Sequence, residues 1–256
     1  MTDKEENIKI ITKDSAKRLL YDVKDVMLNP LADHGIYYIH DEEDILKGYA
    51  LIIGPSDCIY SYGNFFFEFT FPTNYPQSPP TLTYLTNDGH TRFHPNLYRN
   101  GKVCLSILNT WKGEQWTSCQ TIRSVLMTLI TLFHNKSFLN EPGITEKNEE
   151  FDNYHKIIEY KVIETAIIRM TTLEILPKNF TSFIPMIKDN FKKNYDKIVE
   201  KINKLENEKE ETSDVISCRF YNMKLRELNY KYLLKEIQNL GEIYKLEEDK
   251  KLSKKN

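Results

Sequence analysis

The chain has 256 residues, of which 40% are hydrophobic, so it can bury a sizeable core in one domain with an extension. Its 35 basic and 37 acidic residues are mostly intermixed and give a net charge of −2, so no basic patch indicates a nucleic-acid partner. The charged N-terminus lacks the apolar segment of a signal peptide, and apolar stretches such as residues 49–53 are too short to cross a bilayer. We therefore expect no membrane partner and a location in the cytoplasm, with the nucleus as a second compartment.

The first half of the chain predicts a helix followed by a sheet. Apolar residues recur every three or four positions before Asn29-Pro30, which predicts an amphipathic helix that ends there: Ala16, Leu19, Leu20, Val23 and Met27. Four runs rich in β-branched and aromatic residues then predict strands: residues 36–40, 49–53, 65–71 and 81–85. Since no helix separates these runs, we expect an α+β domain with a four-stranded antiparallel meander.

A long connection with little periodicity, residues 86–118, follows the last strand. Compact domains seldom contain so long a connection unless it has a function, and Cys104 lies within it. Ser118 is a plausible N-cap for a second helix. One face of that helix is apolar: Ile122, Val125, Leu126, Leu129 and Phe133.

The C-terminal part of the chain predicts further helices. A third helix is expected to end near Pro177, and two more helices with a polar connector suggest an antiparallel hairpin, the second carrying Tyr221 and Leu225 on its apolar stripe. The apolar stripe of residues 191–205 is either a partner-binding seam or ordinary packing, which is the commoner case. We expect a catalytic core at 12–176, a docked helical extension at 177–248, and flexible termini at 1–11 and 249–256.

The four cysteines, Cys58, Cys104, Cys119 and Cys218, lie far apart and show no Cys-x-x-Cys pairing. In a reducing compartment we expect no disulfide, and the six scattered histidines show no metal-ligand spacing. A cysteine in a long loop is a candidate nucleophile, although a cysteine taken at random is more often a small core residue. The surrounding residues decide between these two interpretations for Cys104.

The segment from Thr12 to about Gly143 resembles the core of the ubiquitin-conjugating (E2) enzymes. After the helix and the meander it contains, in order, the motifs Tyr75-Pro76-x-x-Pro79-Pro80, His94-Pro95-Asn96, Gly101-Lys102-Val103-Cys104-Leu105 and Trp116, and then a helix. The resemblance implies that Cys104 accepts ubiquitin or a ubiquitin-like modifier from an activating enzyme as a thioester. It then passes the modifier to a substrate lysine or to a ligase cysteine, and this function requires a thiol that is open to solvent.

The resemblance also assigns roles to the residues near Cys104. Asn96 either donates to the oxyanion of the transfer step or holds the active-site loop through backbone hydrogen bonds, and the two roles are compatible. His94 is a candidate general base for Cys104, but in this family it is interpreted as a loop-shaping residue, with Pro95 fixing the turn. No cofactor is implied, because ATP is used by the activating enzyme.

Two departures from the common family pattern affect transfer and partners. Where many relatives have an acidic residue that orients the incoming lysine, this chain has Asn140 with Glu141 beside it. An asparagine accepts a hydrogen bond from an ammonium but is not a base, so Glu141 or His134 substitutes, or positioning and desolvation suffice, or the modifier passes to another cysteine. The usual ligase surface is expected at Gln77, Pro79, Trp116 and Cys119, where polar Gln77 replaces a large apolar anchor.

Residues 92–143 are similar to the large Z-type subfamily, whose members are charged by the alternative activating enzyme. We expect a monomer whose partners are a modifier, an activating enzyme and a ligase of unknown class. The alternatives are a catalytically weak ubiquitin-binding variant of the same fold and a hydrolase that uses Cys104 with His94. The retained cysteine argues against the first alternative, and the absence of a recognisable orienting residue argues against the second.

Overall fold

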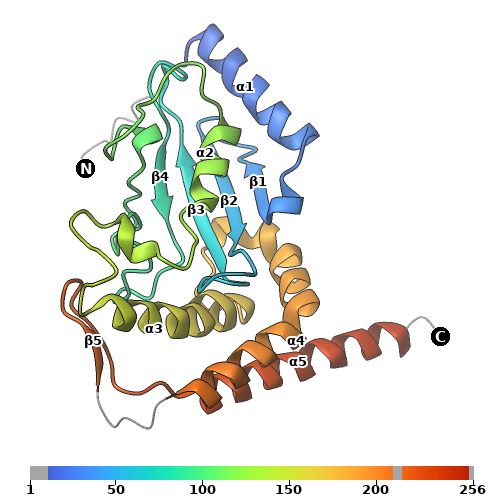
Figure 1. Ribbon diagram of the computed structural model, residues 1–256. Coiled ribbons are helices and arrows are strands. Elements are labelled where there is room, and N and C mark those ends of the chain that lie inside the picture. Colours follow the sequence, from blue (N-terminus) through green and yellow to red (C-terminus); the bar gives the residue numbers. More distant parts are fainter. Residues whose placement is uncertain (1–10, 210–214, 254–256) are drawn as a thin grey trace, which may run out of the picture.

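The computed structural model describes residues 11–209 and 215–253 and places a four-stranded antiparallel sheet among helices (Figure 1). The sheet has the order β1-β2-β3-β4, as the meander of the sequence predicted. The main elements are α1 (Lys13–Leu28), β1 (Ile36–His40), β2 (Lys47–Ile53), β3 (Asn64–Thr70), β4 (Thr81–Tyr84), α2 (Ile122–Ile130), α3 (Phe151–Lys161), α4 (Ile184–Glu208), β5 (Ile216–Cys218), β6 (Met223–Leu225) and α5 (Tyr230–Ser253).

The phenylalanine run of β3 is buried on both faces of the sheet. Side chains alternate between the faces of a strand, so Phe65 and Phe67 join the main apolar cluster, whereas Phe66 joins a second cluster on the opposite face. Phe180 and Phe183, from a 3₁₀ turn that precedes α4, complete that second cluster. The residues just before α4 therefore cover the face of the sheet that the core helices leave open.

Helix α1 ends before Asn29-Pro30 as the sequence predicted, but its buried face is different. The Thr12 side chain accepts a hydrogen bond from the Ser15 amide, and Asn29 caps the other end. The buried stripe runs through Leu19, Asp22, Val23 and Val26. The prediction that Leu20 and Met27 lie on the buried face is wrong, since both side chains are more than half exposed.

Helix α2 begins at Ile122, and its N-cap is Thr121 rather than the expected Ser118. Thr121 Oγ1 accepts from the Ser124 amide at 3.2 Å, and Ser124 Oγ accepts from the Thr121 amide at 2.9 Å. This reciprocal pair satisfies two of the amides that a helix start leaves unpaired. The prediction failed because Ser118 lies in the preceding loop, where its carbonyl accepts from Arg18 instead.

The connection between β4 and α2 is irregular apart from a 3₁₀ turn at Ser106–Leu108, as predicted. It is nevertheless anchored to the sheet, because Tyr84 N donates to Gly101 O and Lys102 forms a bridge with Thr83. Gly101 has φ +88°, and a Cβ there would lie 2.9 Å from the Thr83 methyl carbon. Only glycine fits this close approach without strain.

The third helix of the core continues past α3 as a π-helical segment, Val162–Arg169, and ends before Pro177 as expected. In the extension, α4 and α5 pack along each other through an apolar cluster that includes Ile198, Ile202, Leu233 and Ile237. The stripe of residues 191–205 is therefore largely ordinary packing. A Cβ on Gly241 would lie 2.5 Å from the Tyr195 ring, so the two helices come close together there.

The connection between α4 and α5 contains a β-hairpin that the sequence did not predict. In strands β5 and β6, Ile216 pairs with Leu225 and Cys218 pairs with Met223. The prediction of a helix around Tyr221 is therefore wrong. The hairpin lies beside the start of α3 (Figure 1). Helix α5 continues past residue 248 to Ser253, whereas residues 1–10 and 254–256 of the expected flexible termini lie outside the described residues.

Within the described part of the chain, no helix is long and apolar enough to span a membrane.

The cap of α2 gives a test of the fold. We predict that Thr121→Ala lowers the free energy of unfolding by about 1 kcal/mol, because the Ser124 amide loses its acceptor. The matched control is Thr117→Ala, at an exposed position of the preceding loop, which should change stability by less than about 0.5 kcal/mol. Urea denaturation measures both variants, and equal stabilities would contradict the assignment of Thr121 as the cap.

Candidate functional site

Cys104 is tied to Asn96 through both of its backbone polar groups. The Cys104 amide donates to Asn96 O at 2.9 Å, and Asn96 Nδ2 donates to Cys104 O at 2.6 Å. The neighbouring residues Val103 and Leu97 form a bridge that continues this pairing. The loop that carries the cysteine is thus folded back on the His94-Pro95-Asn96 turn, and the Asn96 amide holds the loop in the way that the second of its two expected roles requires.

The expectation of an open thiol is wrong for this structure, because Cys104 is only 2% exposed. The residues on either side of the cysteine, Val103 and Leu105, lie in the main apolar cluster. Their packing holds the segment against the core. Cys104 itself, however, belongs to none of the apolar clusters formed by the described residues, whereas Cys58 and Cys218 do. Cys104 is therefore a covered loop residue rather than a core-filling thiol.

The other three cysteines have different surroundings. Burial raises the pKa of both Cys58 and Cys218 to about 11, which keeps these thiols protonated near neutral pH. The Cys58 thiol donates to Pro55 O at 3.2 Å. Cys119 is exposed, and all four cysteines are free thiols.

His94 is buried and shapes the turn around Asn96. Its Nδ1 accepts from the Asn96 amide at 3.0 Å. Burial lowers the pKa of His94 well below its ordinary value, and the nearby His134 and Arg92 lower it further. An imidazole whose Nδ1 faces a backbone amide supports the loop-shaping role over that of a base for Cys104. Pro95, also buried, accepts from the Arg92 guanidinium at 2.6 Å.

Asn140 lies in a polar cluster with the side chains of the turn. Its Nδ2 is 3.4 Å from Asn96 Oδ1 and 3.5 Å from His94 Nε2, and its Oδ1 is 3.4 Å from His134 Nε2. The structure thus brings together Asn96, which contacts Cys104, and the asparagine expected to orient lysine. These contacts are long, so the backbone of residues 135–144, here called the gate loop, largely determines where the Asn140 amide lies.

Glu141 is held by a residue that the sequence analysis missed. Its carboxylate accepts a hydrogen bond from the hydroxyl of Tyr221, which lies in the turn between β5 and β6. The sequence did not indicate a role for Tyr221 at the site, because the spacing of Tyr221 to Leu225 and Leu228 is typical of a helix. The available signal was Asn222, a residue type that favours turns, and in the structure it adopts φ +50° between the two strands.

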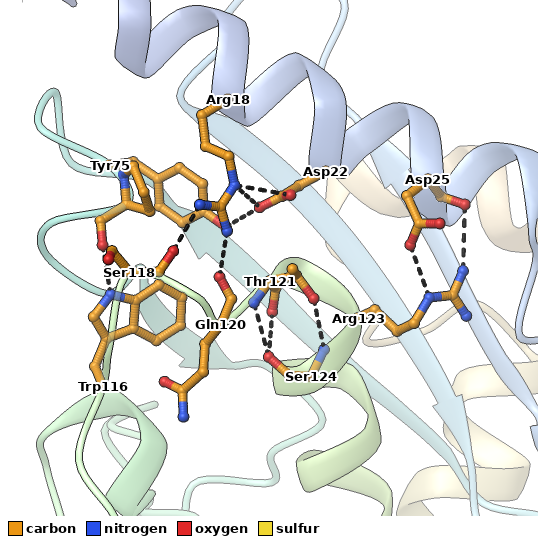
Figure 2. Close-up of polar contacts among 11 residues, drawn as sticks. Arg18, Asp22, Asp25, Tyr75, Trp116, Ser118, Gln120, Thr121, Arg123 and Ser124 are labelled. Atoms are coloured by element: carbon orange, nitrogen blue, oxygen red, sulfur yellow. Dashed lines mark hydrogen bonds and ion pairs between the residues drawn. The ribbon is translucent and has the colours of Figure 1, made fainter.

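The four residues expected to contact partners are not equally accessible. Gln77 and Cys119 are exposed and Pro79 is half-buried. Trp116 is only 8% exposed, so its side chain offers little surface to a partner. Its indole nitrogen donates to Pro76 O at 2.7 Å, and its ring lies beside Tyr75, so it joins the two loops instead (Figure 2).

The loop after Trp116 is also fastened to α1 (Figure 2). The Arg18 guanidinium donates to Ser118 O and to Gln120 O, each at 2.6 Å. Asp22, buried in α1, accepts from the Tyr75 hydroxyl at 2.5 Å and pairs with Arg18 at 3.1 Å. The exposed side chains of both loops are therefore presented on a rigid base.

Among the described residues, no group of three or more His, Cys, Asp or Glu side chains lies close enough to hold a metal ion.

Comparisons with known proteins identify relatives of this chain. The sequence model of the family described as "Ubiquitin-conjugating enzyme" matches residues 18–165. "Ubiquitin-conjugating enzyme E2 Z" of Xenopus tropicalis is 41% identical over 139 residues, which are 53% of this chain and 44% of that protein. The Homo sapiens protein of the same name is 42% identical over 139 residues, which are 53% of this chain and 39% of that protein.

A third relative is matched over a longer segment. "Probable ubiquitin-conjugating enzyme protein 17" of Caenorhabditis elegans is 40% identical over 169 residues, which are 61% of this chain and 23% of that protein. The chain thus matches less than half the length of each of these relatives.

The burial of Cys104 predicts a difference in thiol reactivity. We expect a neutral alkylating reagent to modify exposed Cys119 first and Cys104 much more slowly in the folded protein. Peptide mass spectrometry after timed quenching measures each rate, and denatured protein provides the reference. Equal rates at the two cysteines would contradict the covered position of Cys104.

The lowered pKa of His94 predicts a pH dependence of stability. In the unfolded chain this histidine titrates near pH 6.5, so the unfolded state binds more protons there than the folded state. Stability is therefore full above about pH 7 and falls as the pH decreases through about 6.5. Burial also lowers the pKa of His40 and His155, so His94→Gln should reduce this loss without abolishing it.

Urea denaturation at pH 7.5 and pH 5.5 measures the effect. A His94→Gln variant that loses as much stability as the wild type between these pH values would show that His94 is not held neutral.

Proposed function

This chain belongs to the ubiquitin-conjugating enzyme family, whose sequence model covers more than half of it, and on that premise we propose that Cys104 carries a modifier as a thioester. The single observation that supports this most is the pairing of Cys104 with Asn96 through two hydrogen bonds, at 2.9 and 2.6 Å. This pairing brings the backbone of Cys104 against a side-chain amide that suits acyl transfer.

In the charging step, the Cys104 sulfur attacks the carbonyl carbon of the thioester that joins the modifier to the activating enzyme. The new carbon–sulfur bond forms at Cys104, the bond to the activating enzyme's sulfur breaks, and the proton of the Cys104 thiol leaves to solvent or to the departing thiolate. Because Cys104 is 2% exposed at rest, charging requires the loop around it to open when the activating enzyme docks.

In the transfer step, a lysine amine attacks the thioester carbonyl, the carbon–sulfur bond breaks, and the Cys104 thiolate leaves. Asn96 Nδ2 has two hydrogens, and one is taken by Cys104 O, so the second is available for the oxyanion. Asn140 lies 3.4 Å from Asn96 and can accept a hydrogen bond from the incoming ammonium, which then loses its proton to water. With Glu141 bonded to Tyr221, we assign the orientation of lysine to Asn140.

The partners implied by the family are a modifier, an activating enzyme and a ligase. We propose that the modifier is ubiquitin or a ubiquitin-like protein and that the alternative activating enzyme supplies it, because the chain is 41% and 42% identical to two E2 Z proteins over the matched residues. Gln77, Pro79 and Cys119 are the side chains of the two rigid loops that we assign to ligase contact. The four free cysteines support a reducing compartment such as the cytoplasm, with the nucleus as the alternative.

The second candidate function is a catalytically weak variant of the same fold that binds ubiquitin without carrying it. The observation that favours this candidate is the low exposure of Cys104. Against it stands the complete set of side chains around the cysteine, which a pure binding module does not need. The charging assay separates the two candidates.

We predict that the protein, mixed with ubiquitin, ATP and the alternative activating enzyme, forms an adduct that a thiol reductant removes. Cys104→Ala should abolish this adduct, and Cys104→Ser should trap an ester that resists reductant, since an alkoxide is a poorer leaving group than a thiolate. Gel electrophoresis of samples prepared with and without reductant measures the adducts of both variants. Cys119→Ser is the matched control, because this exposed thiol lies in the loop after Trp116 and not in the segment paired with Asn96.

Adduct formation that survives Cys104→Ala would place the active site elsewhere. Binding of ubiquitin without any adduct, with either activating enzyme, would favour the non-catalytic candidate.

A further inference from the structure

The β5–β6 hairpin of the extension is fixed to the core beside the gate loop. The Glu150 carboxylate, just before α3, accepts from the amides of Arg219 at 2.8 Å and Phe220 at 2.9 Å. Asn153 Nδ2 donates to Ser217 O at 3.2 Å. Two amides on one carboxylate define the position of the hairpin turn closely, because hydrogen bonds to a charged acceptor are stronger than neutral ones.

Tyr221, in that turn, contacts two segments of the site at once. Its hydroxyl donates to the Glu141 carboxylate in the gate loop, and its carbonyl accepts from the Arg99 guanidinium, which follows the His94-Pro95-Asn96 turn. Its ring packs 5.8 Å from the rings of both Phe138 and Tyr154. One residue of the extension therefore links the loop of Cys104 to the loop of Asn140.

A series of contacts leads from Tyr221 to the cysteine. Glu141 follows Asn140 directly, Asn140 Nδ2 lies 3.4 Å from Asn96 Oδ1, and Asn96 Nδ2 donates to Cys104 O. The contacts of the Asn140 side chain are long, so its place depends on the backbone beside it. That backbone is held by the Glu141 amide, which donates to Phe138 O at 3.1 Å, and by the bond from Glu141 to Tyr221.

We propose that Tyr221 is a positioning residue for transfer of the modifier from Cys104 to lysine, acting through Glu141 on the loop that carries Asn140. This inference rests on the proposed function and extends it, because it makes the C-terminal extension part of the transfer site. Burial and the neighbouring Glu141 raise the pKa of Tyr221 above its ordinary value, so its hydroxyl stays a donor at neutral and moderately alkaline pH.

The test separates charging from discharge. Full-length wild type and Tyr221→Phe are charged with ubiquitin by the activating enzyme, ATP is then removed, and the decay of the thioester is followed with free lysine or with a small thiol. Lysine must be oriented and must lose a proton, whereas a small thiol exchanges without help from the gate loop. We expect Tyr221→Phe to charge normally and to react with the thiol at the wild-type rate.

With lysine we expect discharge by Tyr221→Phe to be about three- to tenfold slower, the effect of one lost hydrogen bond. Glu141→Ala, which removes the acceptor, should slow discharge similarly, and the double variant should be no slower than either single variant, because both changes remove the same contact. Tyr244→Phe is the matched control: it removes a hydroxyl in α5 that bonds Thr171 O, away from the hairpin, and should discharge like the wild type.

Equal lysine discharge by Tyr221→Phe and wild type would overturn the inference and leave the proposed function intact. Equal slowing with lysine and with the thiol, or additive effects in the double variant, would show a general structural role and would also overturn it. Absence of any thioester on the wild-type protein would overturn the proposed function and this inference with it.

Discussion

The site depends on the pairing between Cys104 and Asn96. A cysteine in a long connection has no fixed place unless its backbone is bonded, and here its amide and carbonyl both bond to Asn96. Asn96 is fixed in turn by buried His94, which accepts from its amide and stays neutral because burial disfavours its charged form. Two segments of irregular backbone thus form a defined surface for chemistry without belonging to a regular strand or helix.

The same pairing explains why the thiol is covered. The bonds that hold the loop also place Val103 and Leu105 in the apolar core, and Cys104 between them is covered without joining that core. A covered thiol is protected from oxidation and alkylation, and on the proposed function a partner must open the loop before charging. The extension adds a second constraint, because Tyr221 bonds both to Glu141 in the gate loop and to Arg99, which follows the His94-Pro95-Asn96 turn.

Much of the core was predictable because its signals are local. The phenylalanine-rich run of β3 and the apolar period of α1 determine their own structure, and the motifs around Cys104 indicated the family whose sequence model matches the chain. The errors concern long-range contacts. Thr121 rather than Ser118 caps α2, since Ser118 lies in a preceding loop that is fastened to Arg18, a hundred residues away in sequence. Tyr221 looked helical because three-residue strands have too few residues to show alternation against a helical spacing.

The position of the ester bond formed by Cys104→Ser tests the central claim most directly. After charging and proteolysis, tandem mass spectrometry locates the C-terminal remnant of the modifier on a peptide of this chain. We predict that the remnant is attached at position 104, within the peptide that contains Val103 and Leu105. A remnant at Cys119 or on a lysine side chain, with none at position 104, would contradict the assignment of Cys104 as the carrier.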